Sequence, residues 1–176
     1  MDLIVSPACD GWQAVFGSRV WRAAVGRGGI RAEKTEGDGV SPAGCWPIRH
    51  VLYRADRLPA PPTSAFPCTA IDQADGWCDA PADPAYNRPV RLPYLASHEE
   101  MWRQDGLYDI VVVLGHNDAP VVPGAGSAIF LHVADPGYGP TAGCAALAFP
   151  HLLEFLALAQ PGARLCFLAA PNGLAG

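Results

Sequence analysis

The sequence predicts a mainly β fold with a few short helices, organised as a single domain over residues 1–176. Three observations support this prediction. A chain of 176 residues has the length of one ordinary domain. Its 19 glycines and 18 prolines make up about a fifth of the chain, whereas their ordinary combined share is roughly 12%. This excess disfavours long helices. Finally, 50% of the residues are hydrophobic and only 16% are charged, which excludes a disordered chain.

The first third of the chain predicts a β-meander. Short apolar or alternating runs occur at Leu3–Val5, Trp12–Phe16 and Val20–Val25, and glycine-containing turns separate them. The glycine cluster at 26–29 lacks the spacing of a phosphate-binding loop, and no clear helix follows it. We therefore expect a plain loop that leaves the third strand.

A further strand is predicted at Ile48–Tyr53, and we expect the nearby Arg49, Arg54 and Arg57 to face solvent. The following segment, residues 58–92, is rich in Pro, Asp and Ala. It is too long for a simple connection, so it predicts a packed surface loop with a functional or covering role.

Two helices are predicted in the rest of the chain. In Ser97-His98-Glu99-Glu100 a serine precedes a glutamate by three residues, which is the capping-box spacing and predicts a short helix to about Asp105. The stronger helix begins near Pro150 and ends before Pro161-Gly162.

Three strands are predicted around these helices. Tyr108–Leu114 is a continuous β-branched run, which is typical of a strand buried on both faces. Ser127–Val133 follows as a second strand, and Arg164–Ala169 is the last strand of the chain.

Charge and hydropathy limit the partners. The net charge is −5 and no basic stripe is present, so nucleic acid is not expected as a partner. No stretch approaches the roughly 20 apolar residues of a membrane span. The N-terminus lacks the features of a secretory signal, which leaves a cytoplasmic location, a trimmed chain or another export route open.

The six cysteines could form up to three disulfides, although a chain of this length does not require them. Cys68 and Cys78 are the best-placed pair, because each lies in a loop rich in Pro, Asp or Gly. Cys166 is expected to be a small buried residue of the last strand.

Cys144 is the candidate nucleophile. Gly143 allows a tight turn before it, and the amides of both residues could then point at a developing oxyanion. A thiol needs a base to act as a nucleophile, and His132 near the end of a predicted strand is the natural candidate. His116, which is followed by Asn117, is the competing base.

Two other interpretations of these residues remain open. A buried cysteine beside a hydrogen-bonded histidine is a common structural arrangement. A zinc site built from His116, His132 and Cys144 is also conceivable, but the closely spaced ligand pairs of structural zinc sites are missing.

Two segments carry a family resemblance. Ser127–His132, followed by Tyr138–Leu147 with the sequence Thr-Ala-Gly-Cys-Ala-Ala-Leu at its end, resembles the catalytic segment of the YkuD-type L,D-transpeptidases. That family has a strand-terminal histidine followed by Ser/Thr-x-Gly-Cys. Residues 36–44, which contain Ser41-Pro42-Ala43-Gly44, resemble the upstream Thr-Pro-x-Gly turn of the family. The resemblance implies a β-sandwich or barrel with a helix after the catalytic cysteine. Residues 58–105 then read as a subgroup-specific loop and short helix.

The chain departs from the commonest family pattern around the cysteine. Ala142 and Ala146 replace a histidine and an arginine, and no hydroxyl side chain follows His132 in the next two positions. A backbone carbonyl is expected to orient the imidazole instead. His116, Asn117, Tyr138 and Thr141 are the expected substrate-binding residues in place of the missing polar groups.

The resemblance implies a peptidoglycan L,D-transpeptidase of the cell envelope or periplasm. Cys144, with His132 as its base, would form a thioester with a stem tetrapeptide and release D-alanine, and an amine of a neighbouring stem would then take the acyl group. No metal or cofactor is expected, and carbapenems are expected to acylate Cys144. The alternatives are an L,D-carboxypeptidase or endopeptidase acting on wall peptides, and a non-catalytic wall-binding module.

Overall fold

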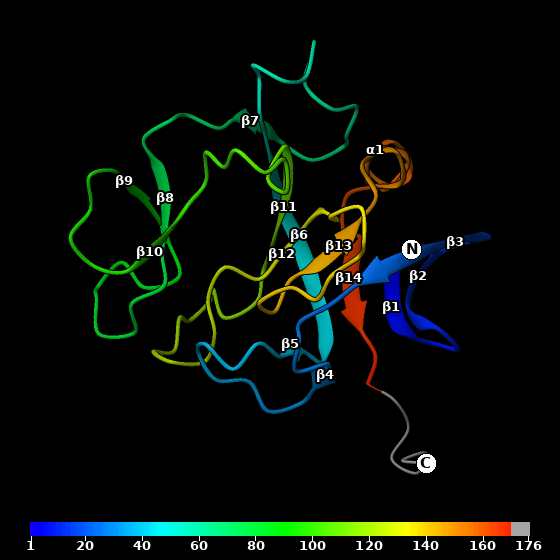
Figure 1. The fold of residues 1–176 in the computed structure, drawn as a ribbon, viewed down its shortest axis with the longest axis horizontal. Coiled ribbons are helices and arrows are strands. Elements are labelled where there is room, and N and C mark those ends of the chain that lie inside the picture. The colour runs from blue at the N-terminus through cyan, green and yellow to red at the C-terminus, as the bar shows by residue number, and fades with distance from the viewer. Residues whose placement is uncertain (170–176) are drawn as a thin grey trace.

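The fold is mainly β, as predicted, in a computed structural model that describes residues 1–169 (Figure 1). The strands are β1 (Leu3–Ala8), β2 (Gly11–Phe16), β3 (Arg19–Ala24), β4 (Ile30–Arg31), β5 (Ser41–Pro42), β6 (Gly44–Tyr53), β7 (Cys68–Ala70), β8 (Asp75–Cys78), β9 (Pro89–Arg91), β10 (His98–Glu100), β11 (Ile110–Leu114), β12 (Phe130–Val133), β13 (Ala145–Leu147) and β14 (Arg164–Phe167). Helix α1 (Phe149–Leu158) lies between β13 and β14. No helix of residues 1–169 has the length and apolar character to cross a membrane.

The largest sheet closes into a barrel. Its strand order is β11-β12-β13-β3-β2-β1-β14-β6-β7, and β11 also pairs with β6, which joins the two sides. The predicted meander is confirmed as the antiparallel strands β1, β2 and β3. Strands β12 and β13 are parallel neighbours, so the chain must cross over between them.

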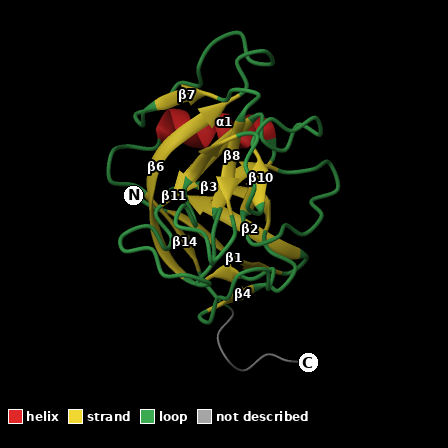
Figure 2. Cartoon of the chain, turned by 90° about the vertical axis from the view of Figure 1, so that its left-hand side faces the viewer, coloured by secondary structure: helices red, strands yellow, loops and turns green. Residues whose placement is uncertain are grey.

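Helix α1 packs against the inside of this barrel. Leu152, Phe155 and Leu156 are fully buried, and the ring of Phe155 meets that of Phe16 edge to face at 5.2 Å. Figure 2 shows the helix lying across the strands near one end of the barrel. The helix predicted from Pro150 is therefore confirmed, with its start one residue earlier, at Phe149.

Strand β11 is buried on both faces, as its sequence predicts. Because side chains alternate along a strand, Ile110, Val112 and Leu114 join the barrel core, whereas Val111 and Val113 point to the outside. A second apolar cluster covers these two valines. The outer face of the barrel is therefore not free at β11.

The cover is the three-stranded sheet β10-β8-β9, here called the covering sheet. Figure 1 shows it beside β11 and β12, on the side of the molecule away from β1 to β3. Trp77 of β8 packs its ring edge to face on Phe130 of β12 at 5.1 Å, and Met101 after β10 is 1% exposed. Side chains from residues 71–102, Trp77 and Met101 among them, thus cover the face of the barrel that includes Cys144. The segment 58–92, predicted as a surface loop, forms β7, β8 and β9, and β7 belongs to the barrel sheet.

The helix predicted from Ser97 to Asp105 is wrong. Residues His98–Glu100 form β10, which pairs antiparallel with β8 and sets Glu99 opposite Trp77. The capping-box spacing is a local signal, and pairing with a neighbouring strand outweighs it here.

The expectation that Arg54 faces solvent is also wrong, since this residue is only 2% exposed. Its Nε and Nη2 each donate to a carboxylate oxygen of Asp56 at 2.8 Å, and its Nη1 donates to the carbonyl oxygen of Arg103. Its guanidinium lies 3.7 Å from the ring centre of Trp102. Arg54 therefore fixes the chain that follows β10.

The disulfide prediction is wrong as well. Cys45 and Cys166 form a disulfide between directly opposed residues of β6 and β14, whereas Cys68 and Cys78 are free thiols. Cys68 belongs to the barrel sheet and Cys78 to the covering sheet, so the two are not partners in one sheet. Cys166 is buried in the last strand as expected, but it is half of a bridge.

Candidate active site

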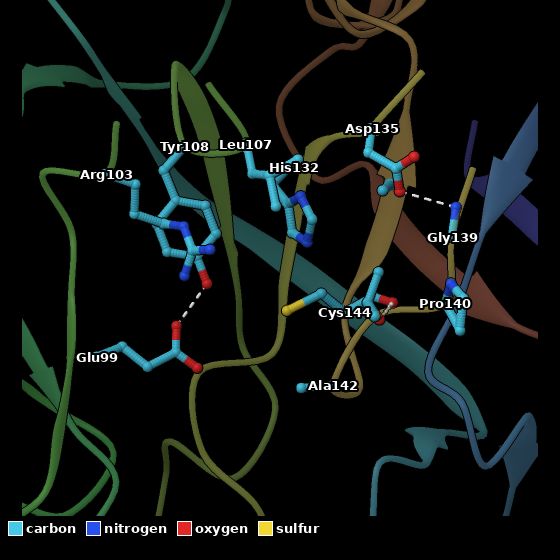
Figure 3. Close-up of a pocket in the computed structure, with 12 residues that line it drawn as sticks. Glu99, Arg103, Leu107, Tyr108, His132, Asp135, Gly139, Pro140, Ala142 and Cys144 are labelled. Atoms are coloured by element: carbon cyan, nitrogen blue, oxygen red, sulfur yellow. Dashed lines mark hydrogen bonds between the residues drawn. The ribbon is translucent and has the colours of Figure 1, made fainter. Parts of the chain in front are cut away.

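A cavity of about 220 Å³ lies between the barrel and the covering sheet (Figure 3). His132 points into it because the alternation of β12 turns His132 to the same outer face as Phe130. Cys144 comes directly before the neighbouring strand β13, where Ala146 pairs with His132. The residues that line the cavity are Glu99, Arg103, Leu107, Tyr108, His132, Asp135, Gly139, Pro140, Thr141, Ala142, Cys144 and Ala146.

The turn before Cys144 requires glycine. Gly143 has a φ of +146°, and a Cβ at this position would lie 3.0 Å from the carbonyl oxygen of Val40. Thr141 holds the same turn, since its Oγ1 donates to the carbonyl oxygen of Cys144 at 2.7 Å and accepts from the amide of Gly143 at 3.1 Å. Thr141 is thus the one predicted substrate-binding residue that lies beside Cys144.

Ser41 supports this turn from behind. Its side chain is completely buried, donates to the carbonyl oxygen of Gly143 at 2.8 Å and accepts from the amide of Gly26 at 2.9 Å. The Ser-Pro-x-Gly segment that the sequence analysis singled out therefore contacts the cysteine turn directly, through its serine.

His132 is held as a neutral base. Its Nδ1 lies 2.8 Å from the carbonyl oxygen of Val133, which can only accept, so Nδ1 carries the proton and Nε2 keeps its lone pair. Burial lowers the pKa of the imidazole from 6.5 to about 4. The ring is therefore uncharged at neutral pH.

The Cys144 thiol is hydrogen-bonded to backbone groups and not to this base. Its Sγ donates to the carbonyl oxygen of Ala128 at 3.2 Å and accepts from the amide of Phe130 at 3.4 Å. Figure 3 shows the sulfur pointing to the side of Glu99 and Tyr108. Burial, together with the charge of Glu99, raises the pKa of the thiol from 9 to about 12. The resting site thus holds a neutral thiol beside a neutral imidazole.

A second cavity of about 170 Å³ adjoins the first one at Cys144. Glu99, Ala142 and Cys144 line both cavities. The second cavity holds acidic and basic side chains, and its lining is completed by Arg27, Lys34, Glu36, Gly37, Asp79, Ser127, Ala128, Ile129 and Gly143. With alanine at 142, no long side chain from that position separates the two spaces.

His116 and Asn117 are not brought to either cavity. The Nε2 of His116 bonds to the carbonyl oxygen of Ala125 at 3.0 Å, and its ring meets that of Trp46 edge to face at 4.6 Å. The side chain of Asn117 donates to two carbonyls of the loop that follows it, those of Val122 at 3.0 Å and Gly126 at 2.9 Å. Both residues shape that loop.

Tyr138 lies at a separate cavity, which it lines together with Trp12 and Pro140, and the guanidinium of Arg22 stands 4.5 Å from its ring centre.

The predicted zinc ligands do not come together, because His116 does not line the cavity that holds His132 and Cys144. Within residues 1–169, no group of three or more His, Cys, Asp or Glu side chains is arranged to hold a metal ion.

The residues that line the cavity but were not predicted from the sequence include Glu99, Arg103 and Tyr108. The Tyr108 hydroxyl donates to Oε2 of Glu99 at 2.5 Å, and the guanidinium of Arg103 lies 5.0 Å from the tyrosine ring centre. The helix predicted from Ser97 places Glu99 in its first turn, so the strand neighbours of Glu99 could not be inferred. Alternation with the exposed Glu100 in a strand would have indicated that only one of the two faces inward.

Comparison with known proteins bears on this site. A family model described as the YkuD L,D-transpeptidase catalytic domain matches residues 12–165, which include Cys144, His132 and the covering sheet. None of the curated proteins matches the chain.

Proposed function

Because this chain belongs to the YkuD family of L,D-transpeptidase catalytic domains, we propose that it is an active peptidoglycan L,D-transpeptidase with Cys144 as nucleophile and His132 as base. One observation carries the proposal: two adjacent strands bring the thiol and a neutral imidazole to the same cavity. We take residues 1–176 as one catalytic domain. The family acts on peptidoglycan peptides, which gives the substrate class.

Acylation begins with a rotation of the cysteine side chain. The thiol leaves the carbonyl of Ala128 and turns to Nε2 of His132, which takes its proton. The sulfur then attacks the carbonyl carbon of the residue joined to the terminal D-alanine of a stem tetrapeptide. With a thiol pKa of about 12 and an imidazole pKa of about 4, proton transfer accompanies attack and does not precede it.

The tetrahedral oxyanion needs donors at the turn. The Cys144 amide is the first candidate, and the Gly143 amide becomes a second when it exchanges its bond to Thr141 for one to the oxyanion. Collapse breaks the C–N bond, the imidazolium protonates the leaving D-alanine, and a thioester remains on Cys144. An amine of a neighbouring stem then forms the new amide and releases the thiol.

The location that we propose is the cell envelope. The Cys45–Cys166 bridge favours an oxidising compartment, which agrees with a substrate outside the cytoplasm. The site residues supply every proton transfer in this scheme, and it uses no metal or cofactor.

The test is incubation of the purified chain with a disaccharide tetrapeptide, followed by mass analysis. We expect cross-linked dimer, released D-alanine and a transient acyl adduct on Cys144. Tripeptide without dimer would identify an L,D-carboxypeptidase, and the absence of any product or adduct would favour a non-catalytic wall-binding module.

A carbapenem provides a second probe of the nucleophile. We expect one covalent adduct by intact mass, lost in Cys144→Ala and retained in Cys9→Ser, which removes the exposed thiol. An adduct that persists in Cys144→Ala would overturn the assignment.

A further inference from the structure

Glu99 is a carboxylate in the active cavity that the acylation scheme does not use. It comes from β10 of the covering sheet, and Figure 3 shows it opposite His132, across Cys144. Its Oε2 accepts the bond from Tyr108, whereas Oε1 has no hydrogen-bond partner among residues 1–169. Burial raises the pKa of this carboxyl group, and the charges of Asp79 and Glu36 act in the same direction.

The position of Glu99 works against the first half of the reaction. Its negative charge contributes to the raised pKa of Cys144, so a neutral residue here would favour formation of the thiolate. The nearby cation Arg103 does not neutralise it by direct pairing, because its guanidinium is bound to Asp105. Glu99 is an energetically unfavourable carboxylate beside the nucleophile. Such a group indicates a role after acylation, in the transfer of the acyl group to the acceptor.

Asp79 adds an independent observation. It lines the second cavity together with Glu99 and Cys144, and its Oδ1 is buried without a hydrogen-bond partner among the described residues. A buried acceptor of this kind carries a desolvation cost that a ligand with several N–H donors would offset. The other carboxylate there, Glu36, is already bound by Tyr86 and Ser127.

We propose that Glu99, assisted by Asp79, binds the ammonium group of the acyl acceptor beside the Cys144 thioester and takes its proton before attack. The inference rests on the proposed transpeptidase function and names its second substrate as a primary amine that is cationic in solution. The site would thereby favour an amine over water as the acceptor.

The proposed step is balanced in atoms and charge. Glu99 accepts one proton from R–NH₃⁺, which leaves R–NH₂ and a neutral carboxyl group. The amine nitrogen attacks the thioester carbon, the C–N bond forms, and the nitrogen loses a second proton to Nε2 of His132. The C–S bond then breaks, and the imidazolium returns that proton to the sulfur, which restores the neutral thiol and imidazole.

The test uses thiol reagents of different charge and does not depend on turnover. Cys144 is modified with 2-aminoethyl methanethiosulfonate, which is cationic, and with methyl methanethiosulfonate, which is neutral, and each site is quantified by peptide mass. The exposed Cys9 in the same molecule is the internal reference. We expect the cationic-to-neutral rate ratio to be about tenfold higher at Cys144 than at Cys9.

Two variants locate the source of that preference. Glu99→Gln should bring the ratio at Cys144 down to that of Cys9, and Asp79→Asn should lower it partly. Glu100→Gln makes the same change on the exposed neighbour in β10 and should leave the ratio unchanged. Equal ratios in the parent and Glu99→Gln would overturn the proposal.

A second readout follows the thioester formed with the tetrapeptide. In Glu99→Gln, transfer to a cationic primary amine should fall about tenfold relative to hydrolysis, whereas transfer to hydroxylamine, which is neutral at pH 7, should not change. Unchanged transfer to both would refute the role in deprotonation. If the parent forms no thioester at all, the proposed function fails, and the charge ratio at Cys144 still decides whether Glu99 and Asp79 bind ammonium groups.

Discussion

The thiol of Cys144 donates its hydrogen bond to the carbonyl oxygen of Ala128, 3.2 Å away, and not to His132 in the same cavity. Since the thiol pKa is raised to about 12 and the imidazole pKa is lowered to about 4, the resting pair carries no charge. Substrate must therefore enter before the nucleophile is activated.

Alkylation of Cys144 by iodoacetamide should consequently be slow. A pKa of about 12 leaves about a thousandfold less thiolate at neutral pH than a pKa of 9. We expect the rate at Cys144 to be at least about 100-fold below that at the exposed Cys9, by peptide mass at pH 7. His132→Asn should change the rate at Cys144 less than about threefold. Fast alkylation that depends on His132 would instead reveal a resting thiolate–imidazolium pair.

The burial of neutral His132 predicts acid sensitivity. Its pKa is about 4 in the folded chain and 6.5 without burial, so the unfolded chain binds the proton more readily between these values. The contribution of neutral His132 to the free energy of unfolding is complete above pH 6.5 and is lost as the pH falls towards 4. Between pH 7 and pH 4.5 the parent should lose roughly 2–3 kcal/mol more free energy of unfolding than His132→Gln, measured by urea denaturation. Equal losses would mean that the imidazole is not buried as a neutral group.

Ser41 should matter for both stability and acylation. Ser41→Ala removes the buried partner of Gly26 and Gly143, which should lower the free energy of unfolding by about 1–3 kcal/mol. Ser6→Ala is the matched control, because that half-buried hydroxyl accepts only a long bond of 3.4 Å from Gln13. Its effect should stay within about 0.5 kcal/mol. Similar losses in the two variants would contradict a special role for Ser41.

Patterns that repeat along the chain were sufficient to predict much of this fold. The β-branched run at 108–114 predicted a strand buried on both faces, since a strand with apolar residues on each face must be covered twice. The apolar stripe after Pro150 predicted α1 for a similar reason. Cys144, Thr141 and His132 were found by their spacing, and they lie together at one cavity.

Contacts between distant segments could not be predicted in this way. The pairing of Cys45 with Cys166 spans 121 residues and depends on the register of β6 and β14. Glu99 reaches the cavity only because β10 pairs with β8. This strand forms where the local capping signal predicts a helix. His116 follows a strand that leads towards the site, but its side chain turns to Trp46.

Gly143 offers a test of the turn geometry. In Gly143→Ala the methyl group meets the backbone oxygen of Val40 at 3.0 Å and φ stays at +146°, so the loss should be about 2–4 kcal/mol, with thioester formation abolished. Gly11→Ala separates the two causes, since its φ is +128° but nothing lies within 4 Å of the added methyl. Its loss should be about 1–2 kcal/mol, by urea denaturation. A Gly143→Ala variant as stable as Gly11→Ala would show that the turn can relax.

The Cys45–Cys166 bridge should be a major source of stability. It joins residues 121 positions apart, and the chain-entropy argument assigns a loop of that size about 4–5 kcal/mol, although measured values centre on about 2–4 kcal/mol. Reduction, or the double variant Cys45→Ala/Cys166→Ala, should therefore lower the Tm by about 10 °C. Cys68→Ser/Cys78→Ser is the control, because both thiols are free, and it should keep the full response to reductant. If that control removed the response instead, the stabilising bridge would be the one between Cys68 and Cys78, and β6 and β14 would be held by their hydrogen bonds alone.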